Sequence, residues 1–188
     1  MDYSFKNTIR PKPGSILLSD PFLQEDYFTR SVVLVCEHNS NGSFGLVLNN
    51  LIDIQLNQLD PAFPITSKQV SIGGPVDEQN ICYVHSFGER VENSLFISDD
   101  IYFGGDFDQL SEAFKNNPGG NLLFFLGYSG WSPGQLSEEL KANSWLVIDN
   151  ITPTEIYEQP SDFWKYCMNK QGKRFAAMSN FPINPHDN

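Results

Sequence analysis

The stretch Gly127 to Trp145, GYSGWSPGQLSEELKANSW, constrains the fold most, because it joins a glycine-rich turn to the start and stop signals of a helix. Ser132 followed by Gln135 matches a capping box, and Pro133 would occupy the first helical position. Asn143 supplies a left-handed stop. These signals predict a helix of about ten residues, flanked by a strand on each side.

The best hairpin signal lies nearer the N-terminus. The run SVVLVCE, Ser31 to Glu37, and the run Ser43 to Asn49 flank Asn41-Gly42, a dipeptide typical of hairpin turns. Because the first run is apolar at successive positions, both of its faces should be buried. We therefore predict that this strand lies in the middle of a sheet that is covered on both sides.

The remaining pattern alternates short strands with few helices. Strands are predicted at 15–19, 69–72, 81–87, 95–98, 101–103, 122–128 and 145–149, and helices after Asp106, after Thr152 and over 161–169. Residues 51–59 fit a strand or a turn of helix, and residues 21–30 fit a short helix or a loop. The pattern predicts an α+β fold with a mixed, mostly antiparallel sheet flanked by roughly three to four helices. The unit at 121–149 could add a parallel crossover.

Length and composition favour one domain. The chain has 188 residues, of which 40% are hydrophobic, so it can bury one core and is short for two. We expect a single domain over residues 1–188, with residues 1–10 and 180–188 loosely ordered. Three cysteines, an odd set with members in apolar runs, indicate buried reduced thiols.

The charge of the chain limits its partners. A formal net charge of −11 repels nucleic-acid phosphates and anionic membrane surfaces, so direct nucleic-acid binding is not expected. The apolar runs are far shorter than a membrane span, and the polar N-terminus lacks the apolar segment of a signal peptide. The sequence therefore predicts a cytoplasmic protein without a membrane-bound part.

Residues Glu37, His38 and Asn39 stand at the mouth of the predicted hairpin. An imidazole beside a carboxylate can act as a general base, and His85 near the end of another strand could join it. The simpler interpretation is that His38 and Asn39 hydrogen-bond the loop. Cys36 and His38 would share a strand face, whereas Cys82 and His85 would not, so a zinc site made from these four is awkward. No metal and no cofactor are predicted.

Three glycine-rich turns could hold a ligand or simply allow close packing. Neither a Walker spacing nor a dinucleotide fingerprint is present, and Ser129 lacks the glycine two residues later that a nucleophile elbow requires. No catalytic signature is therefore recognised. The candidate residues for a ligand or interaction site are Glu37, His38, Asn39, Gly73, Gly74, His85, Tyr128, Ser129, Gly130 and Trp131.

Several motifs follow one another along residues 14–170. They are Gly14 to Ser19 with Pro21, Val32 to Asn39 with Gly42, Gly45 to Val47 with Asn49, Gly73 to Val76, His85, Gly104-Gly105, Gly127 to Trp131, Pro133 to Leu136, Glu139 and Trp145. In this combination the chain resembles the AlgH/YqgE family of bacterial proteins. It departs from the family at Asn50-Leu51, where a basic residue and a proline are common, and in lacking a glycine-histidine ending.

The resemblance implies a compact bacterial cytosolic α+β domain with a mixed, barrel-like sheet. The family carries the label of a transcriptional regulator and no established activity. Two hypotheses follow for this chain. The first is a non-enzymatic regulatory or interaction module with an unknown protein or small-molecule partner. The second is an enzyme that acts on a small molecule through Glu37, His38 and His85.

Overall fold

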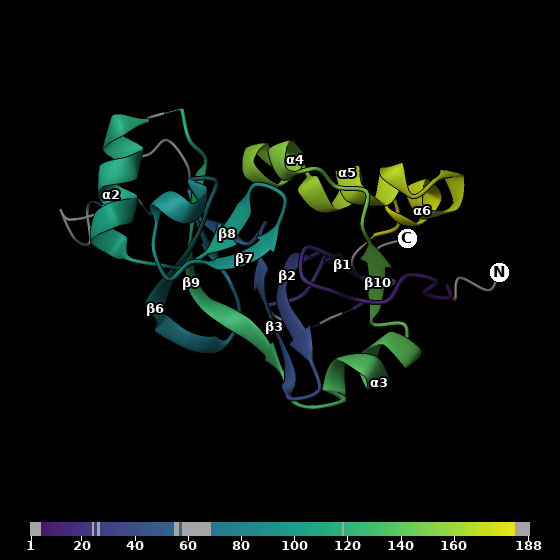
Figure 1. Ribbon diagram of the computed structural model, residues 1–188. Helices are drawn as coiled ribbons and strands as arrows, with labels where there is room; N and C mark the ends of the chain where they lie inside the picture. The colour runs from purple at the N-terminus through teal and green to yellow at the C-terminus, as the bar shows by residue number, and fades with distance from the viewer. Residues whose placement is uncertain are drawn as a thin grey trace.

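The computed structural model describes residues 5–182 apart from residues 24, 26, 55, 56, 58–68 and 118. The strands are β1 (Ile16–Ser19), β2 (Val32–Asn39), β3 (Gly42–Val47), β4 (Leu51–Ile52), β5 (Val70–Ile72), β6 (Val76–His85), β7 (Leu95–Ser98), β8 (Ile101–Phe103), β9 (Leu122–Trp131) and β10 (Trp145–Ile148) (Figure 1). The helices are α2 (Phe107–Asn116), α3 (Gln135–Lys141), α4 (Pro153–Glu158), α5 (Phe163–Lys170) and α6 (Lys173–Met178), with a short 3-10 helix, η1, at Gly88–Arg90.

These strands form one sheet in the order β10-β1-β2-β3-β9-β6-β8-β7, and β5 pairs with both β9 and β4. Every pair is antiparallel except β5 with β9, so the α+β class and the mixed, mostly antiparallel sheet are confirmed. The first and last strands of this order are not paired with each other in the described part of the chain. The expected barrel-like closure is therefore not observed.

The predicted hairpin is present and central. Asn39 pairs with Gly42 across the turn, and β2 lies between β1 and β3. Side chains of β2 alternate between two separate apolar clusters: Leu34 and Cys36 belong to one, Val33 and Val35 to the other. Because both clusters are buried, the expectation that this strand is covered on both sides is confirmed.

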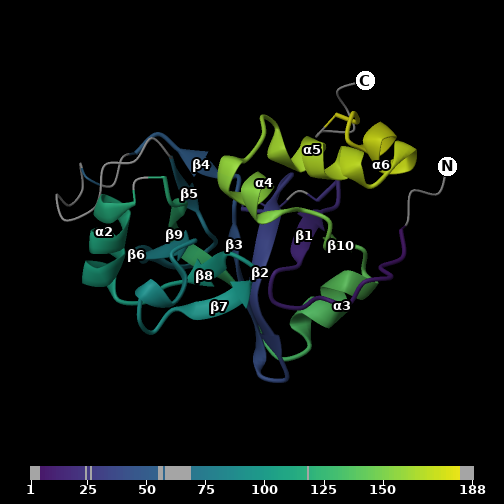
Figure 2. The same ribbon diagram turned by 45° about the horizontal axis from the view of Figure 1, so that its top comes forward.

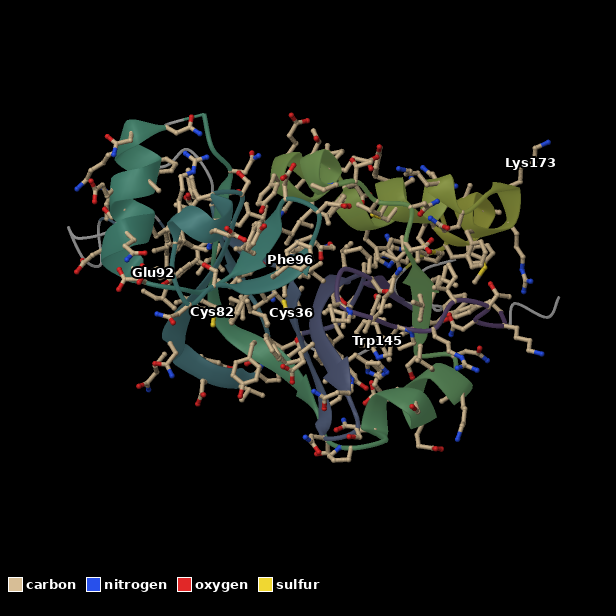
Figure 3. All side chains as sticks on the ribbon, viewed as in Figure 1. Cys36, Cys82, Glu92, Phe96, Trp145 and Lys173 are labelled. Atoms are coloured by element: carbon tan, nitrogen blue, oxygen red, sulfur yellow. The ribbon has the colours of Figure 1, made fainter. Side chains whose placement is uncertain are left out.

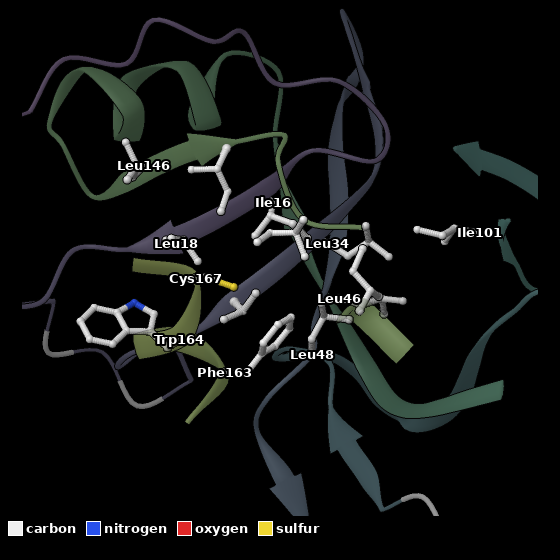
Figure 4. Close-up of a cluster of buried hydrophobic side chains, with 14 of the residues drawn as sticks. Ile16, Leu18, Leu34, Leu46, Leu48, Ile101, Leu146, Phe163, Trp164 and Cys167 are labelled. Atoms are coloured by element: carbon white, nitrogen blue, oxygen red, sulfur yellow. The ribbon is translucent and has the colours of Figure 1, made fainter. Parts of the chain in front are cut away.

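Helices cover the two faces of the sheet unequally. One face packs against α4, α5 and α6 above β1, β2 and β10, where Phe163 and Trp164 of α5 share one buried cluster with Leu18 and Leu34 (Figures 2 and 4). The other face carries α3 beside β10 and, farther along the sheet, α2 beside β6 and β9.

The sheet curls strongly about the first of these faces. Phe44 on β3 and Phe103 on β8 have ring centroids 5.2 Å apart, although β9 and β6 lie between their strands. This contact is possible only if the face is concave, since two strands in between would separate flat neighbours by roughly 14 Å. The helices α4–α6 cover one part of the concave face, and the part near the β2–β3 turn is left open.

The helix after β9 differs from its prediction. It spans Gln135–Lys141, seven residues, and begins after Gly134, whose φ of 80° ends the preceding turn. Ser132 does not cap it through its side chain; only the reverse half of the capping box forms, in which the Ser132 N–H donates to Gln135 Oε1 at 3.0 Å. Pro133 therefore lies in a turn before the helix. Asn143 has a φ of 60°, which confirms the left-handed stop.

Three further expectations need correction. The strands β9 and β10 lie far apart in the sheet, so residues 121–149 form no parallel crossover, and the parallel pair is β5 with β9. The helix expected to end before Gly172 does end there, but α6 follows it, so the described residues contain five helices instead of three or four. Within 51–59, β4 is a short strand, and residues 55, 56, 58 and 59 lie outside the described residues.

The first described residues are attached to the sheet. Phe5 is buried, and the Asn7 side chain bonds the backbone of β10 at two points. The expected loose ends at residues 1–4 and 183–188 lie outside the described residues. No helix in the described ranges is long and apolar enough to span a bilayer.

Candidate functional site

An open groove of about 790 Å³ occupies the uncovered end of the concave face. It lies between the β2–β3 hairpin, the last part of β9 and the first part of β6. Its lining residues are Glu37, Asn41, Gly42, Ser43, Phe44, Val76, Asp77, Asn80, Cys82, Phe103, Tyr128, Gly130, Trp131, Ser132 and Pro133. A volume of this size is within the usual range for a site that binds a drug-sized ligand or a short peptide.

Strand register places the groove's side chains on one face. Glu37 pairs with Phe44, Phe44 pairs with Gly130, and Tyr128, two residues along β9, pairs with Val76. Directly paired residues of antiparallel strands point to the same side of a sheet. The four strands therefore bring one carboxylate, two aromatic rings and one valine to a continuous surface.

Two bulges turn the key side chains toward the groove. In β2, Val35 pairs with Gly45 but Glu37 pairs with Phe44, so Cys36 is an extra residue. In β9 the pairing with β6 is interrupted around Gly127, whose φ is 66°. A bulge shifts the alternation of the strand by one residue. As a result Glu37 and Tyr128 face the concave side. In regular strands both side chains would point to the opposite side of the sheet.

The groove has an aromatic floor and an acidic rim. The ring of Phe44 makes edge contacts with Phe103 at 5.2 Å and with Tyr128 at 6.0 Å between centroids. The carboxylates of Glu37 and Asp77 stand exposed on opposite walls. Among the described residues that line it, none is lysine, arginine or histidine. The groove therefore favours positively charged groups attached to apolar ones.

The wall formed by β6 is irregular. Val76 pairs with Tyr128 and Ile81 pairs with Leu126, so four residues of β6 stand opposite one residue of β9. Asp77 begins this bulge with a φ of 51°, a left-handed conformation that aspartate tolerates better than most residues. The bulge places Asp77 and Asn80 at the groove edge, where they have no paired residue on β9.

Two of the glycine-rich turns, at Gly73-Gly74 and at 127–130, converge, and their glycines allow close packing. A Cβ atom on Gly74 would lie 2.4 Å from the Tyr128 carbonyl, and one on Gly73 would lie 2.3 Å from the Gly127 carbonyl oxygen. The buried Ser129 hydroxyl donates to the Gly73 carbonyl at 2.9 Å. These contacts close the fork where β5 enters between β3 and β9. Gly73, Gly74 and Ser129 thus shape the sheet beneath the groove and do not line it.

Trp131 is fixed by a shared carboxylate. Its indole N–H donates to Glu139 Oε2 at 2.8 Å, and the indole of Trp145 donates to the same oxygen at 2.7 Å (Trp145 is labelled in Figure 3). Gln135 donates to the other Glu139 oxygen at 2.9 Å. The helix α3 is thereby tied to β9 and β10. The Trp131 ring packs in the apolar cluster on the α3 face of the sheet, so these bonds fix the end of β9 that borders the groove.

Comparison with known proteins identifies the family. A family model described as AlgH-like matches residues 16–176. The chain belongs to the AlgH-like family. A UPF0301 protein of Parabacteroides distasonis is 38% identical, with 97% of this chain and 94% of that protein covered. Another, from Cytophaga hutchinsonii, is 34% identical and covers 93% of this chain and 98% of its own length.

Two solved structures share the AlgH-like fold. A Corynebacterium diphtheriae protein solved by X-ray crystallography has a TM-score of 0.79 and 24% identity, and 95% of each chain is covered. The solution structure of the AlgH protein from Pseudomonas aeruginosa has a TM-score of 0.70 and 23% identity, with 95% of this chain and 98% of that chain covered. At these identities the comparison concerns the fold alone.

In this AlgH-like chain the hairpin tip is stabilised by its own side chains. His38 Nδ1 lies 2.7 Å from the Ser43 hydroxyl, and Asn39 donates to Glu37 at 2.9 Å while accepting from the Asn41 N–H at 2.7 Å. The interpretation that His38 and Asn39 hydrogen-bond the loop agrees with these contacts. Glu37 remains exposed, with its carboxylate available to the groove.

His85 is a core residue. Its side chain is fully buried between the rings of Phe87 and Tyr102, Nε2 lies 3.0 Å from the Gly104 carbonyl, and Nδ1 accepts the Phe87 N–H at 3.2 Å. Burial lowers the pKa of His85, and the bond to Gly104 partly offsets this. The imidazole is therefore neutral and satisfied, with its proton on Nε2.

The structure does not bring His38 and His85 together. His85 pairs with Leu122 at one end of β9, whereas the partner of His38, Ser43, pairs with Trp131 at the other end. A strand of ten residues is about 30 Å long. A catalytic site combining Glu37, His38 and His85 is therefore not formed.

The three cysteines are reduced and differ in access. Cys36 and Cys167 are buried, and burial raises the pKa of both thiols. Cys82 is partly exposed in the groove, and its pKa is raised by burial and by the nearby Asp77 (Figure 3). Within the described ranges no three His, Cys, Asp or Glu side chains are grouped closely enough to hold a metal ion.

Of the ten candidate residues, Glu37, Tyr128, Gly130 and Trp131 line the groove. Phe44, Phe103 and the bulge with Asp77 were not predicted from the sequence. One signal was available for Phe44: a two-residue turn after Asn39 places it opposite Glu37. The polar run DEQN inside a strand pattern also indicates a bulge.

Proposed function

We propose that the protein is a non-enzymatic interaction module that binds a partner through the groove between the β2–β3 hairpin and β6. The observation that carries this proposal is the partly exposed aromatic floor of Phe44, Phe103 and Tyr128, at an end of the concave face that no helix of the described residues covers. Apolar rings left open beside exposed carboxylates are typical of recognition surfaces.

The residues around the groove support binding more than catalysis. Cys82 has a raised pKa, which disfavours the thiolate that a nucleophile needs. The carboxylates of Glu37 and Asp77 stand on opposite walls of the groove. His38 of the hairpin and His85 of β6 are both engaged in structural hydrogen bonds. A regulatory role, as in our first hypothesis, would then be exercised through the bound partner.

A groove-filling variant tests the proposal. Gly130 has ordinary strand geometry, and a Cβ there would lie 3.5 Å from the Tyr128 ring, so Gly130→Leu should fold and place a branched side chain in the groove. Tagged wild-type and variant chains would be incubated with an extract of the cells that naturally contain the protein. Partners retained by the wild type and lost by Gly130→Leu support the proposal once they rebind as purified components.

Alkylation of Cys82 provides a direct readout at the groove. Among the three cysteines it is the most accessible, so a maleimide should label it first, and a Cys82→Ser chain serves as the blank. A partner in the groove should slow this labelling. Equal retention by wild type and Gly130→Leu, with unchanged labelling of Cys82, would reject the interaction role of the groove.

A further inference from the structure

The groove also indicates which chemistry its partner carries. We infer that it binds an extended segment of a partner protein that presents two basic residues four positions apart with an apolar residue midway between them. This inference rests on the proposed interaction role of the groove and specifies its ligand.

Charge is the first argument. Glu37 and Asp77 are exposed on the two walls, and Asn41, Ser43 and Asn80 complete a polar rim. No cationic side chain lines the groove in the described part of the chain, and the whole chain has a formal net charge of −11. An acidic partner would be repelled at long range and left unpaired at the rim, whereas a basic one is attracted and oriented.

The separation of the carboxylates is the second argument. Glu37 lies on β2 and Asp77 follows Val76 on β6, and the pairs Glu37 with Phe44 and Tyr128 with Val76 show that β3 and β9 lie between them. Three strand spacings correspond to roughly 14 Å in a flat sheet, and the curl of this sheet brings the two walls closer than that. A ligand with a single ammonium group can neutralise one carboxylate, whereas a ligand with two basic groups can pair with both. Residues i and i+4 of an extended chain are about 13 Å apart and can reach both.

The floor supplies the third argument. Phe44 and Tyr128 lie between the two carboxylates, and Phe103 closes the floor behind them. In an extended segment the side chains of i, i+2 and i+4 point to the same side. The residue at i+2 therefore meets the aromatic floor when the residues at i and i+4 meet Glu37 and Asp77. A polyamine would satisfy the carboxylates but leave the rings without an apolar partner.

A selection experiment on the full chain tests this pattern. A displayed library of random nine-residue peptides would be selected on the wild-type protein and depleted on Gly130→Leu, whose fold is checked by circular dichroism. We expect enriched peptides to carry lysine or arginine at two positions four apart, with an aliphatic or aromatic residue at the middle position. Enrichment of acidic or uncharged peptides would overturn the inference.

Affinity measurements on an enriched peptide then separate the contributions. By fluorescence anisotropy, Glu37→Gln and Asp77→Asn should each weaken binding about three- to fivefold at low salt, because each removes one rim charge. Asparagine tolerates the left-handed backbone at 77 as aspartate does. Glu112→Gln, on the exposed side of α2, makes the same change in net charge elsewhere and should alter the affinity less than about twofold. Serine at the middle position of the peptide should weaken binding about tenfold.

The outcomes distinguish this inference from the proposal beneath it. If peptides bind in a Gly130-dependent manner but are indifferent to Glu37 and Asp77, the ligand class is wrong and the interaction role stands. If spermidine competes as well as the peptide, and the middle residue has no effect, the extended segment is likewise wrong. If no peptide and no extract component depends on Gly130, both the ligand class and the interaction role fail.

Discussion

At the scale of single residues, Glu139 holds together the segment from Gly127 to Trp145, in which the glycine-rich turn leads into α3. Both indole N–H groups of Trp131 and Trp145 donate to one of its oxygens, and the two side chains are only 6% and 2% exposed. Buried donors of this kind are expensive to leave unpaired. The carboxylate thus serves the packing of α3 on the sheet and fixes the end of β9 that borders the groove.

Glu139→Ala should lower the free energy of unfolding by about 2–4 kcal/mol, because two buried indole donors lose their acceptor. Urea unfolding followed by circular dichroism measures this change. Glu138→Ala is the matched control, since Glu138 is adjacent and its salt bridge to Lys141 is about 70% exposed at both side chains (71% for Lys141, 73% for Glu138). The control should lose less than about 1 kcal/mol. Equal losses in the two variants would contradict the role of Glu139.

Two glycines of the converging turns, Gly74 and Gly130, should differ in how much their replacement by alanine lowers stability. Gly74 has a φ of 151°, and its Cβ would lie 2.4 Å from backbone atoms of Tyr128, so Gly74→Ala should destabilise by roughly 3 kcal/mol. Gly130 lies in the same region with room for a Cβ, and Gly130→Ala should change stability by less than about 1 kcal/mol. Thermal unfolding of both variants tests this difference. If both variants were destabilised equally, the distinction between the two glycines would be wrong.

The site was less predictable from the sequence than the strands were, and the bulges are the reason. Regular alternation from Cys36 places Glu37 on the opposite face, and only the extra residue at Cys36 turns it toward the groove. Gly127 has the same effect on Tyr128. Hydrophobic periodicity shows which residues are apolar, but it does not reveal a one-residue shift in strand register. The face to which a side chain after a bulge points therefore cannot be predicted from it. His85 was chosen as a candidate although it lies in the core, because the sequence alone does not distinguish a buried, hydrogen-bonded histidine from a catalytic one.

At the scale of elements, the sheet's outer strand β10 is protected by a side chain. Asn7 Nδ2 donates to the Trp145 carbonyl at 2.8 Å, and Asn7 Oδ1 accepts the Val147 N–H at 2.8 Å. These are the two contacts that a neighbouring strand would make. A single carboxamide thus occupies part of an edge that could otherwise pair with another chain.

Asn7→Ala should therefore expose the edge of β10. We expect a loss of about 1–2 kcal/mol in unfolding free energy and increased self-association at high protein concentration. Urea unfolding and sedimentation velocity measure the two effects. Lys6→Ala changes an exposed neighbour and should leave both unchanged. A variant at Asn7 that remains as stable and as monodisperse as the Lys6 control would show that the edge needs no such cover.

Element boundaries were predictable where one local device decides them. Asp106 accepts the Gln109 N–H at 2.9 Å and begins α2, and Thr152 with Glu155 forms the complete capping box of α4. The start of α3 was missed because Gly134 adopts a left-handed conformation, which allows a turn to intervene between Ser132 and the helix. The strands were recognised individually, but their order depends on contacts between residues far apart in the chain, and no local pattern reports it.

At the scale of the whole molecule, two buried or clustered ionisable groups and the net charge determine how stability depends on pH. Burial lowers the pKa of His85 below its ordinary value of 6.5. Burial alone would raise the pKa of Glu155, but hydrogen bonds from Lys170, Thr152 and Tyr166 lower it to about 2. In both cases the folded state resists protonation that the unfolded state accepts.

The free energy of unfolding should consequently fall in two steps as the solution is acidified. For His85 the stabilisation is fully present above about pH 6.5, where both states are neutral, and declines as pH falls toward the lowered folded pKa. For Glu155 it is present above about pH 4.5 and is lost as pH falls through about 2. Between these two steps a second effect raises the free energy of unfolding. The net charge of −11 falls to zero near the pI of 4.5, so the repulsion between negative charges in the folded protein is relieved.

Urea unfolding at a series of pH values, with two variants, separates these contributions. His85→Gln should flatten the decline that begins near pH 6.5 and leave the lower one in place. Glu155→Gln should do the reverse, and at pH 7 it should cost about 1 kcal/mol, a value discounted for the partial exposure of its pair with Lys170. If both variants instead follow the wild-type profile in parallel, the net charge alone governs the pH dependence, because a uniform charge effect is insensitive to which of the two sites is removed.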